Sequence, residues 1–210
     1  MSTDDPASVI VVHGLWMPGS ETWLLRRRLA ARGFRPFLFR YRTVGRGLDH
    51  NSDALARFAA GVAGRRVNFV GYSLGGVVCV NMFKRGMIER AGRLVCIGSP
   101  LNGSSTARAL LDWPGGRRFL GRSVADLTQR GGLGHWDGPV ELGSLAGCIG
   151  VGLGLLSGGL HGPNDGTVAV EETRIDGARD HVVRNVSHTT MLFSRIVADD
   201  IAHFLEHGRF

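Results

Sequence analysis

Cysteine is scarce in this chain of 210 residues: only Cys79, Cys96 and Cys148 occur, far apart and in apolar surroundings. An odd number of cysteines argues against a disulfide framework, and their spacing matches no metal-binding motif. We therefore expect three reduced cysteines in the core and no metal site.

A long apolar run is also lacking. The longest weakly polar stretch, 143–160, is interrupted by seven glycines and two serines, whereas a membrane-spanning helix needs about 20 mainly apolar residues. The first residues, 1–6, are acidic and polar and show neither the basic nor the apolar region of a signal peptide. We expect a cytoplasmic protein without an integral membrane segment.

Lysine occurs once, as Lys84, so the formal net charge of +7 comes almost wholly from arginine. A basic chain raises the question of a nucleic-acid partner. The arginines are scattered, however, and no helix-turn-helix, zinc-finger or stacking-aromatic pattern accompanies them. The sequence therefore indicates a solvated basic surface and no nucleic-acid partner.

Short β-branched runs alternate with amphipathic stretches along the chain. Strands are predicted at 9–12, 34–41, 67–70, 94–98, 140–148, 168–173 and 181–186, and helices at 21–32, 51–62, 77–90, 107–111 and 188–207. Such alternation predicts a parallel sheet with right-handed crossovers. Because there is neither a repeat nor a linker, residues 1–210 are expected to form one α/β domain.

The strongest local signal is Gly71-Tyr72-Ser73-Leu74-Gly75. It fits the pattern G-x-S-x-G between a predicted strand and a predicted helix, which is the context of a nucleophile elbow. The serine sits on a strained turn there, and a Cβ at either glycine would crowd the adjacent strand and helix. We therefore predict that Ser73 is a catalytic nucleophile.

A nucleophilic serine needs a base, and in this architecture the order along the chain is serine, acid, histidine. The histidines after Ser73 are His135, His161, His181, His188, His203 and His207. The base must lie beyond the carboxyl end of the last strand, where the active site forms. Only His188 directly follows the last predicted strand, so it is the predicted base; its alternative role is that of a neighbour of a helix N-cap.

The acid must precede His188, and five carboxylates qualify by order: Asp165, Glu171, Glu172, Asp176 and Asp180. Asp165 lies in a turn-rich loop just before an apolar run, where an orienting acid is expected. Asp176 is better explained by a turn with Gly177, and Asp180 by the flank of a strand. We favour Asp165, with ordinary turn chemistry in Asn164-Asp165-Gly166 as the alternative.

Acyl transfer also needs two backbone N–H groups that stabilise an oxyanion, and one such donor is worth about 2.7–4 kcal/mol of the barrier. The residue after the nucleophile, Leu74, is the first predicted donor. The second is Leu15 in the loop after the first strand, with Trp16 as the alternative. The preceding His13 is expected to position that loop, and Trp16 and Tyr72 are expected to contact the substrate.

These residues together resemble the α/β-hydrolase superfamily, and within it the small bacterial lipases and esterases. The resemblance extends through 9–14, 71–76, 97–104, 164–168 and 187–189. It implies an α/β-hydrolase fold, with a mostly parallel central sheet, helices on both faces and a short cap-like insertion. It also implies a cofactor-free enzyme in which Ser73, Asp165 and His188 cleave carboxylic esters.

The segment 103–137 is less regular than the rest and is predicted to be a cap or lid that selects the substrate, with a plain insertion as the alternative. Its arginines are expected to be solvated; contact with an anionic substrate or a membrane surface is the alternative. The expected substrate is a small-molecule or lipid ester with a short to medium acyl group.

Two other functions remain open at this point. The same three residues would serve an acyltransferase or a thioesterase. A non-catalytic relative that binds a ligand or partner is the alternative from another class, although all three catalytic positions are filled here.

Overall fold

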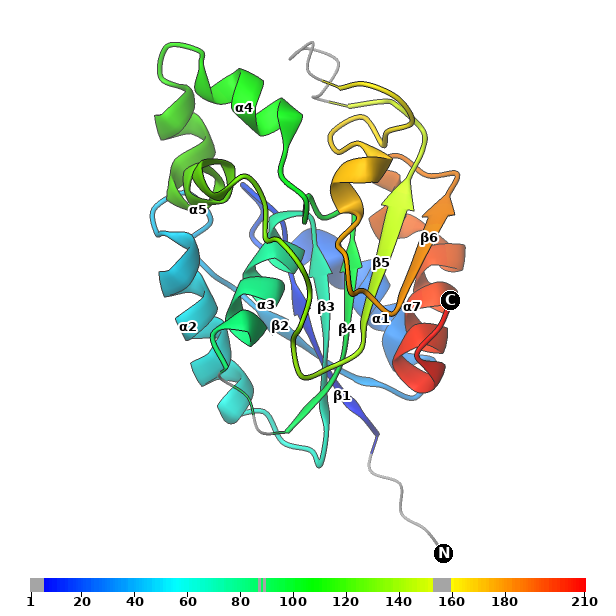
Figure 1. The fold of residues 1–210 in the computed structure, drawn as a ribbon. Helices are drawn as coiled ribbons and strands as arrows, with labels where there is room; N and C mark the ends of the chain where they lie inside the picture. The colour runs from blue at the N-terminus through cyan, green and yellow to red at the C-terminus, as the bar shows by residue number, and fades with distance from the viewer. Residues whose placement is uncertain (1–5, 87, 89, 153–159) are drawn as a thin grey trace, which may run out of the picture.

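The computed structural model describes residues 6–86, 88, 90–152 and 160–210. Six strands form one sheet in the order β2-β1-β3-β4-β5-β6, and every adjacent pair is parallel (Figure 1). The strands are β1 Ser8–Val12, β2 Arg35–Phe39, β3 Val67–Tyr72, β4 Ala91–Ile97, β5 Leu142–Gly147 and β6 Asp180–Arg184.

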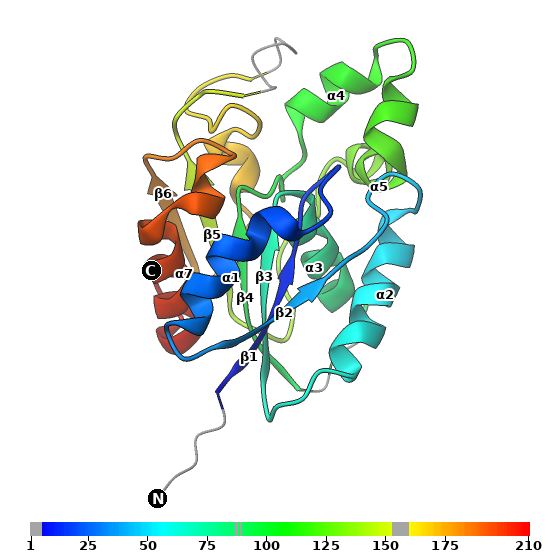
Figure 2. The same cartoon turned by 180° about the vertical axis from the view of Figure 1, so that it is seen from behind.

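Helices cover both faces of the sheet. The helices α2 Leu48–Ala60 and α3 Leu74–Lys84 pack on one face, and α1 Trp23–Ala30 and α7 Arg195–His207 on the other (Figure 2). Because successive side chains of a strand point to opposite faces, Ile10 and Val12 enter the first core, and Val9 and Val11 the second. The predicted fold class, a parallel sheet between two helical layers, is confirmed.

The sheet order creates a switch point between β1 and β3. From β1 the chain crosses to β2 on one side, and from there it crosses back to β3 on the other side. The loops that leave the carboxyl ends of β1 and β3 therefore diverge, which is where open α/β sheets bind their ligands. Ser73 follows β3 directly, and Leu15 lies in the loop after β1.

The prediction of a strand at 168–173 is wrong. Residues Val170–Thr173 form a 3-10 helix, η2, instead. The Thr173 hydroxyl donates to the Val170 carbonyl at 2.7 Å, and the Glu172 carboxylate accepts from the Ala169 amide at 3.0 Å. These local hydrogen bonds satisfy polar groups of the turn. The apolar residues that suggested a strand are buried beneath it.

The segment 103–137 contains two helices where one was predicted. The helix α4 Ser105–Leu111 contains the predicted 107–111, and α5 Gly116–Arg130 follows it. The glycines in α5 obscured its pattern, since Gly121 has a left-handed φ of 79° and kinks the helix. Asp126 of α5 accepts a hydrogen bond from the Leu48 amide at 2.8 Å, which attaches α5 to the start of α2.

Two predicted helices have different ends. The helix expected from 77 to 90 is α3, which ends at Lys84 before a turn at Arg85 and Gly86, and residues 87 and 89 lie outside the described part. The helix expected from 188 begins only at Arg195, because 188–194 form a loop and the short 3-10 helix η3 Thr190–Phe193. The Ser194 side chain caps α7 by accepting from the Val197 amide at 3.3 Å.

The cysteines are free, and two of the three lie in the core. Cys79 and Cys96 are buried, whereas Cys148 is only partly buried, with its Sγ 3.1 Å from the Asn185 side-chain oxygen. Within the described ranges, none of the helices combines the length and apolarity that crossing a bilayer requires. Of the weakly polar stretch 143–160, residues 143–147 belong to β5 and 153–159 lie outside the described residues; the start of the chain, 1–5, lies outside them too.

The first turn of α3 lies in unusually close contact with the strands. A Cβ on Gly75 would overlap the Val12 carbonyl oxygen and lie 2.7 Å from that of His13, and a Cβ on Gly71 would overlap the backbone of Gly76. All these obstacles are backbone atoms, which cannot rotate away as a side chain can. The glycines of the G-x-S-x-G motif are therefore required by packing, as the sequence predicted.

We predict that Gly75→Ala lowers the free energy of unfolding by about 1–3 kcal/mol, the usual cost of overpacking. Gly45→Ala is the matched control, because a Cβ there meets nothing within 4 Å, and it should change stability by no more than about 0.5 kcal/mol. Urea unfolding followed by circular dichroism measures both. Equal stability of the two variants would contradict the packing argument.

Candidate active site

Ser73 occupies the sharp turn between β3 and α3. Its backbone has φ 53° and ψ −122°, a conformation that residues with a Cβ rarely adopt. The turn is fixed by two backbone hydrogen bonds: the Ser73 amide donates to the Ile97 carbonyl at 2.9 Å, and the Gly76 amide donates to the Ser73 carbonyl at 3.1 Å. The neighbouring β4 thus helps to keep Ser73 at the carboxyl end of the sheet.

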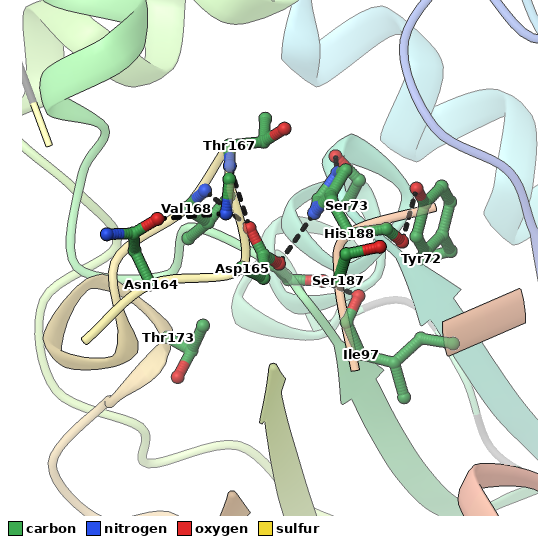
Figure 3. Close-up of polar contacts among 12 residues, drawn as sticks. Tyr72, Ser73, Ile97, Asn164, Asp165, Thr167, Val168, Thr173, Ser187 and His188 are labelled. Carbon is green, nitrogen blue, oxygen red and sulfur yellow. Dashed lines mark hydrogen bonds and ion pairs between the residues drawn. The ribbon is translucent and has the colours of Figure 1, made fainter. Parts of the chain in front are cut away.

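His188 reaches Ser73 from the loop that follows β6. Its Nε2 lies 3.1 Å from Ser73 Oγ, and its Nδ1 lies 2.7 Å from Asp165 Oδ2 (Figure 3). The His188 amide also donates to the Asp165 carbonyl at 2.8 Å. The structure therefore brings together the three residues that were selected from the sequence as nucleophile, base and acid.

Asp165 is completely buried, and both of its carboxylate oxygens have partners. Oδ1 accepts from the amides of Thr167 at 2.9 Å and Val168 at 2.7 Å, while Oδ2 faces His188. These amides belong to the same loop, so the turn that was the alternative explanation for Asp165 is also what orients its carboxylate. Of the other carboxylates considered, Glu172 accepts from the Ser105 amide at 2.5 Å and thereby attaches the start of α4.

This arrangement can transfer a proton from the serine hydroxyl. A carboxylate beside Nδ1 favours the tautomer with hydrogen on Nδ1, which leaves Nε2 free to accept the proton of the Ser73 hydroxyl. The same carboxylate stabilises the imidazolium that would form. The geometry therefore meets the requirements for activating a serine nucleophile.

Two unpaired backbone amides lie beside Ser73. Leu15 and Leu74 both line the same cleft as Ser73, and within the described part of the chain neither amide has a hydrogen-bond partner. The alternative donor, Trp16, has its amide directed at the Thr43 hydroxyl at 3.2 Å. Of the two candidates in the loop after β1, Leu15 is therefore the one whose N–H is free to bind an oxyanion.

The two residues expected to contact substrate differ in position. Trp16 lines the cleft, and its indole N–H donates to the Phe119 carbonyl at 2.9 Å. Tyr72 does not line it, so that prediction is wrong. Tyr72 is the last residue of β3, and its side chain enters the core beneath α1 and α7, where it is 1% exposed. Its hydroxyl donates to the His188 carbonyl at 3.0 Å, and its ring packs against the imidazole.

Tyr41, the other tyrosine of the chain, has an equivalent role that sequence reasoning missed. Its hydroxyl donates to the His13 carbonyl at 2.9 Å, and its ring stacks on the imidazole of His13 with 4.6 Å between centroids. Burial lowers the pKa of His13, which favours the neutral ring in this stack. Each tyrosine thus fixes the backbone of one loop of the site. No motif marks Tyr41, because its partner lies 28 residues away.

An apolar cleft of about 80 Å³, open to solvent, adjoins Ser73. One wall comes from α4 and α5, the helices of segment 103–137. The lining residues are Leu15, Trp16, Ser73, Leu74, Pro100, Ser104, Thr106, Ala107, Leu110, Leu120, Val124, Leu127, Thr167 and Val168. None of these side chains is charged. Among the residues that the structure describes, no group of three or more His, Cys, Asp or Glu is arranged to hold a metal ion.

A family model described as the alpha/beta hydrolase family matches residues 9–200. The chain belongs to this family. The match includes all of β1 except Ser8, the elbow and both loops that carry Asp165 and His188. No curated protein sequence matches this hydrolase.

Solved structures with the same fold are distant in sequence. A mature lipase of Bacillus licheniformis is 20% identical with a TM-score of 0.74, over 97% of this hydrolase and 93% of that chain. A metagenomic carboxyl esterase is 18% identical with a TM-score of 0.73, over 98% and 77%. A meta-cleavage product hydrolase of Pseudomonas fluorescens is 16% identical with a TM-score of 0.65, over 96% and 91%. These likenesses establish the fold.

We predict that Tyr72→Phe slows the reaction of Ser73 with a fluorophosphonate probe by about tenfold, because the His188 loop loses a hydrogen bond worth about 1–3 kcal/mol once its buried carbonyl is unpaired. Ser52→Ala is the control. It removes another buried hydroxyl, which donates to the backbone carbonyl of Val78 at 3.1 Å and lies away from the site. It should lower stability without slowing labelling. Equal labelling rates for Tyr72→Phe and wild type would show that the bond does not position the histidine.

Proposed function

We propose that this hydrolase cleaves carboxylic esters through an acyl-enzyme on Ser73. The observation that carries the proposal is the continuous chain of contacts from Ser73 Oγ to His188 at 3.1 Å and from His188 to Asp165 at 2.7 Å. In this proposal Ser73 is the nucleophile, His188 the general base and Asp165 the orienting acid. The presence of all three favours catalysis over a purely binding role.

The reaction proceeds in two halves. His188 takes the proton of Ser73 as Oγ attacks the ester carbonyl, and the amides of Leu15 and Leu74 stabilise the oxyanion that develops. The protonated His188 then donates its proton to the leaving alcohol, which leaves the acyl group on Ser73. In the second half His188 deprotonates a water molecule, which attacks the acyl-enzyme and releases the carboxylic acid. No step requires a cofactor.

The cleft supports an uncharged, apolar acyl group. Its lining is mainly aliphatic, and the segment 103–137 acts as a cap in this proposal because α4 and α5 provide one wall. The names of two structural neighbours, a lipase and a carboxyl esterase, agree with an ester substrate, and the proposed acyl group is of short to medium length. The free cysteines support a cytoplasmic location within the same proposal.

We expect Ser73→Ala to lower kcat for p-nitrophenyl butyrate by about 10⁴-fold or more, and Asp165→Asn by about 10³–10⁴-fold. The loss in Asp165→Asn follows because an amide does not stabilise the imidazolium. Ser105→Ala is the matched control, since this serine lies at the same end of the molecule and makes no side-chain hydrogen bond within the described residues. Circular dichroism verifies that each variant folds.

Wild-type turnover with an unaffected Ser73→Ala variant would overturn the assignment of the nucleophile. If the wild type is inert toward the ester, fluorophosphonate labelling and an acyl-thioester substrate decide the outcome. Labelled Ser73 with thioester turnover favours the thioesterase function instead, and an unlabelled serine favours the binding protein.

The width of the cleft should set the preferred acyl length. Val124 is a buried lining residue of α5, so Val124→Trp is expected to lower the ratio of kcat/KM for octanoate over butyrate esters by about tenfold or more. Leu110→Ala, which widens the same wall, should raise that ratio. Thermal unfolding monitors overpacking in Val124→Trp. Unchanged ratios in both variants would show that acyl chains bind elsewhere.

A further inference from the structure

The outer surface of the α4–α5 hairpin is basic and aromatic. Between 108 and 122 it carries four arginines and one carboxylate. The arginines are Arg108, Arg117, Arg118 and Arg122, and all four are exposed. Two aromatic side chains on the same hairpin are also exposed, Trp113 at 52% and Phe119 at 57%. These six residues together are termed the hairpin surface below.

The arginines of the hairpin surface have no carboxylate partners. Within the described residues, none of the four lies within 4.0 Å of a carboxylate oxygen, whereas Arg130 at the end of α5 pairs with Asp49 at 3.0 Å. The exposed Arg42 and Arg46 extend this surface, because the loop that carries them bonds to α5: the Ser123 hydroxyl donates to the Arg46 carbonyl at 2.9 Å. The positive charge is thus uncompensated and free to meet an external anion.

The arginines of the hairpin surface lie outside the cleft. None of its four arginines lines the cleft, and no lining side chain is charged. An anionic substrate seated beside Ser73 would therefore contact none of these arginines directly. The aromatic residues connect the two regions, because the Phe119 ring packs on that of Trp16, 4.4 Å between centroids, at the mouth of the cleft.

Two groups of exposed apolar residues lie at the same end of the molecule. The strands point toward the end from which the α4–α5 hairpin projects, and β1 begins at the other end (Figure 1). Ile149 and Val151, which follow β5 at the same end, are 44% and 66% exposed. A Cβ on Gly166, next to Asp165, would overlap the backbone of Val151, so this second apolar group borders the loop of the acid.

We propose that the hairpin surface docks the hydrolase on an anionic lipid surface, with the mouth of the cleft toward the membrane. Arginines attract anionic headgroups, and tryptophan and phenylalanine insert at the level of the headgroups. Because no arginine of this surface enters the cleft, docking does not depend on the proposed ester chemistry. It would supply a lipid ester directly to a cleft whose lining is apolar.

The test is cosedimentation of the full-length chain with vesicles of phosphatidylcholine, with and without phosphatidylglycerol. We expect binding only to the anionic vesicles, weakened by added salt. The variant Arg117→Gln with Arg118→Gln should bind about 30-fold more weakly, which corresponds to about 1 kcal/mol per arginine. Trp113→Ala should weaken binding by about tenfold, because partial burial of the indole is lost.

The matched control is Arg65→Gln with Arg66→Gln, an adjacent and exposed pair that precedes β3 at the opposite end of the molecule. It removes the same charge and should leave vesicle binding unchanged. Equal loss in both double variants would overturn the proposal, since the attraction would then follow net charge alone. Tighter binding to double-stranded DNA than to anionic vesicles, or full displacement from vesicles by millimolar inorganic phosphate, would also overturn it.

Turnover of soluble p-nitrophenyl butyrate separates this proposal from the proposed function. Both double variants should keep wild-type turnover, because their arginines lie outside the cleft. Vesicle binding by a chain without esterase activity would leave docking in place and remove the ester chemistry. Esterase activity without vesicle binding would leave the ester chemistry in place and overturn the docking proposal.

Discussion

The contact between the first turn of α3 and the ends of β1 and β3 is the constraint on which the site depends. Gly75 has no Cβ, so the first turn of α3 lies against the carbonyls of Val12 and His13, and Gly71 has none either, so the end of β3 lies against the backbone of Gly76. This closeness forces Ser73 into its left-handed conformation with φ 53°. It also places the amide of Leu74 beside the loop that carries Leu15. The nucleophile and both candidate oxyanion donors are therefore consequences of one packing contact at the switch point of the sheet.

The remaining parts of the site are loops, and each is fixed by bonds to a neighbouring element. Tyr72 at the end of β3 binds the His188 loop, and Tyr41 after β2 binds the loop after β1. The amides of Thr167 and Val168 orient Asp165. Loops carry higher conformational entropy than strands, so these buried hydrogen bonds limit the motion that would otherwise misplace the reacting atoms. The hydrogen bonds to the core thus keep the loops at the carboxyl end of the sheet, where the chemistry is proposed, in fixed positions.

The residues of the α4–α5 hairpin face two different surfaces. Leu120, Val124 and Leu127 recur at helical spacing and line the apolar cleft, whereas Arg117 and Arg118 face solvent. One short segment can therefore determine which acyl group enters and which surface the molecule approaches. Its attachment through Asp126 and Ser123 to α2 and its preceding loop keeps both faces in a constant relation to Ser73.

The sequence by itself determined the parallel sheet, the order of its strands and helices, and the motif around Ser73, because these follow from local periodicity and from glycines that packing requires. Chain order and turn chemistry were enough to select His188 and Asp165, which the structure brings within hydrogen-bond distance. The local pattern misled the prediction at 168–173, where apolar residues are buried beneath a turn, and at α5, whose glycines hide its helical spacing.

Only the tertiary structure decided that Tyr72 supports His188 from the core, that the Trp16 amide donates to the Thr43 hydroxyl, and that Tyr41 fixes His13. Those contacts join residues distant in sequence, and no spacing along the chain encodes which side chain meets which carbonyl across a folded sheet.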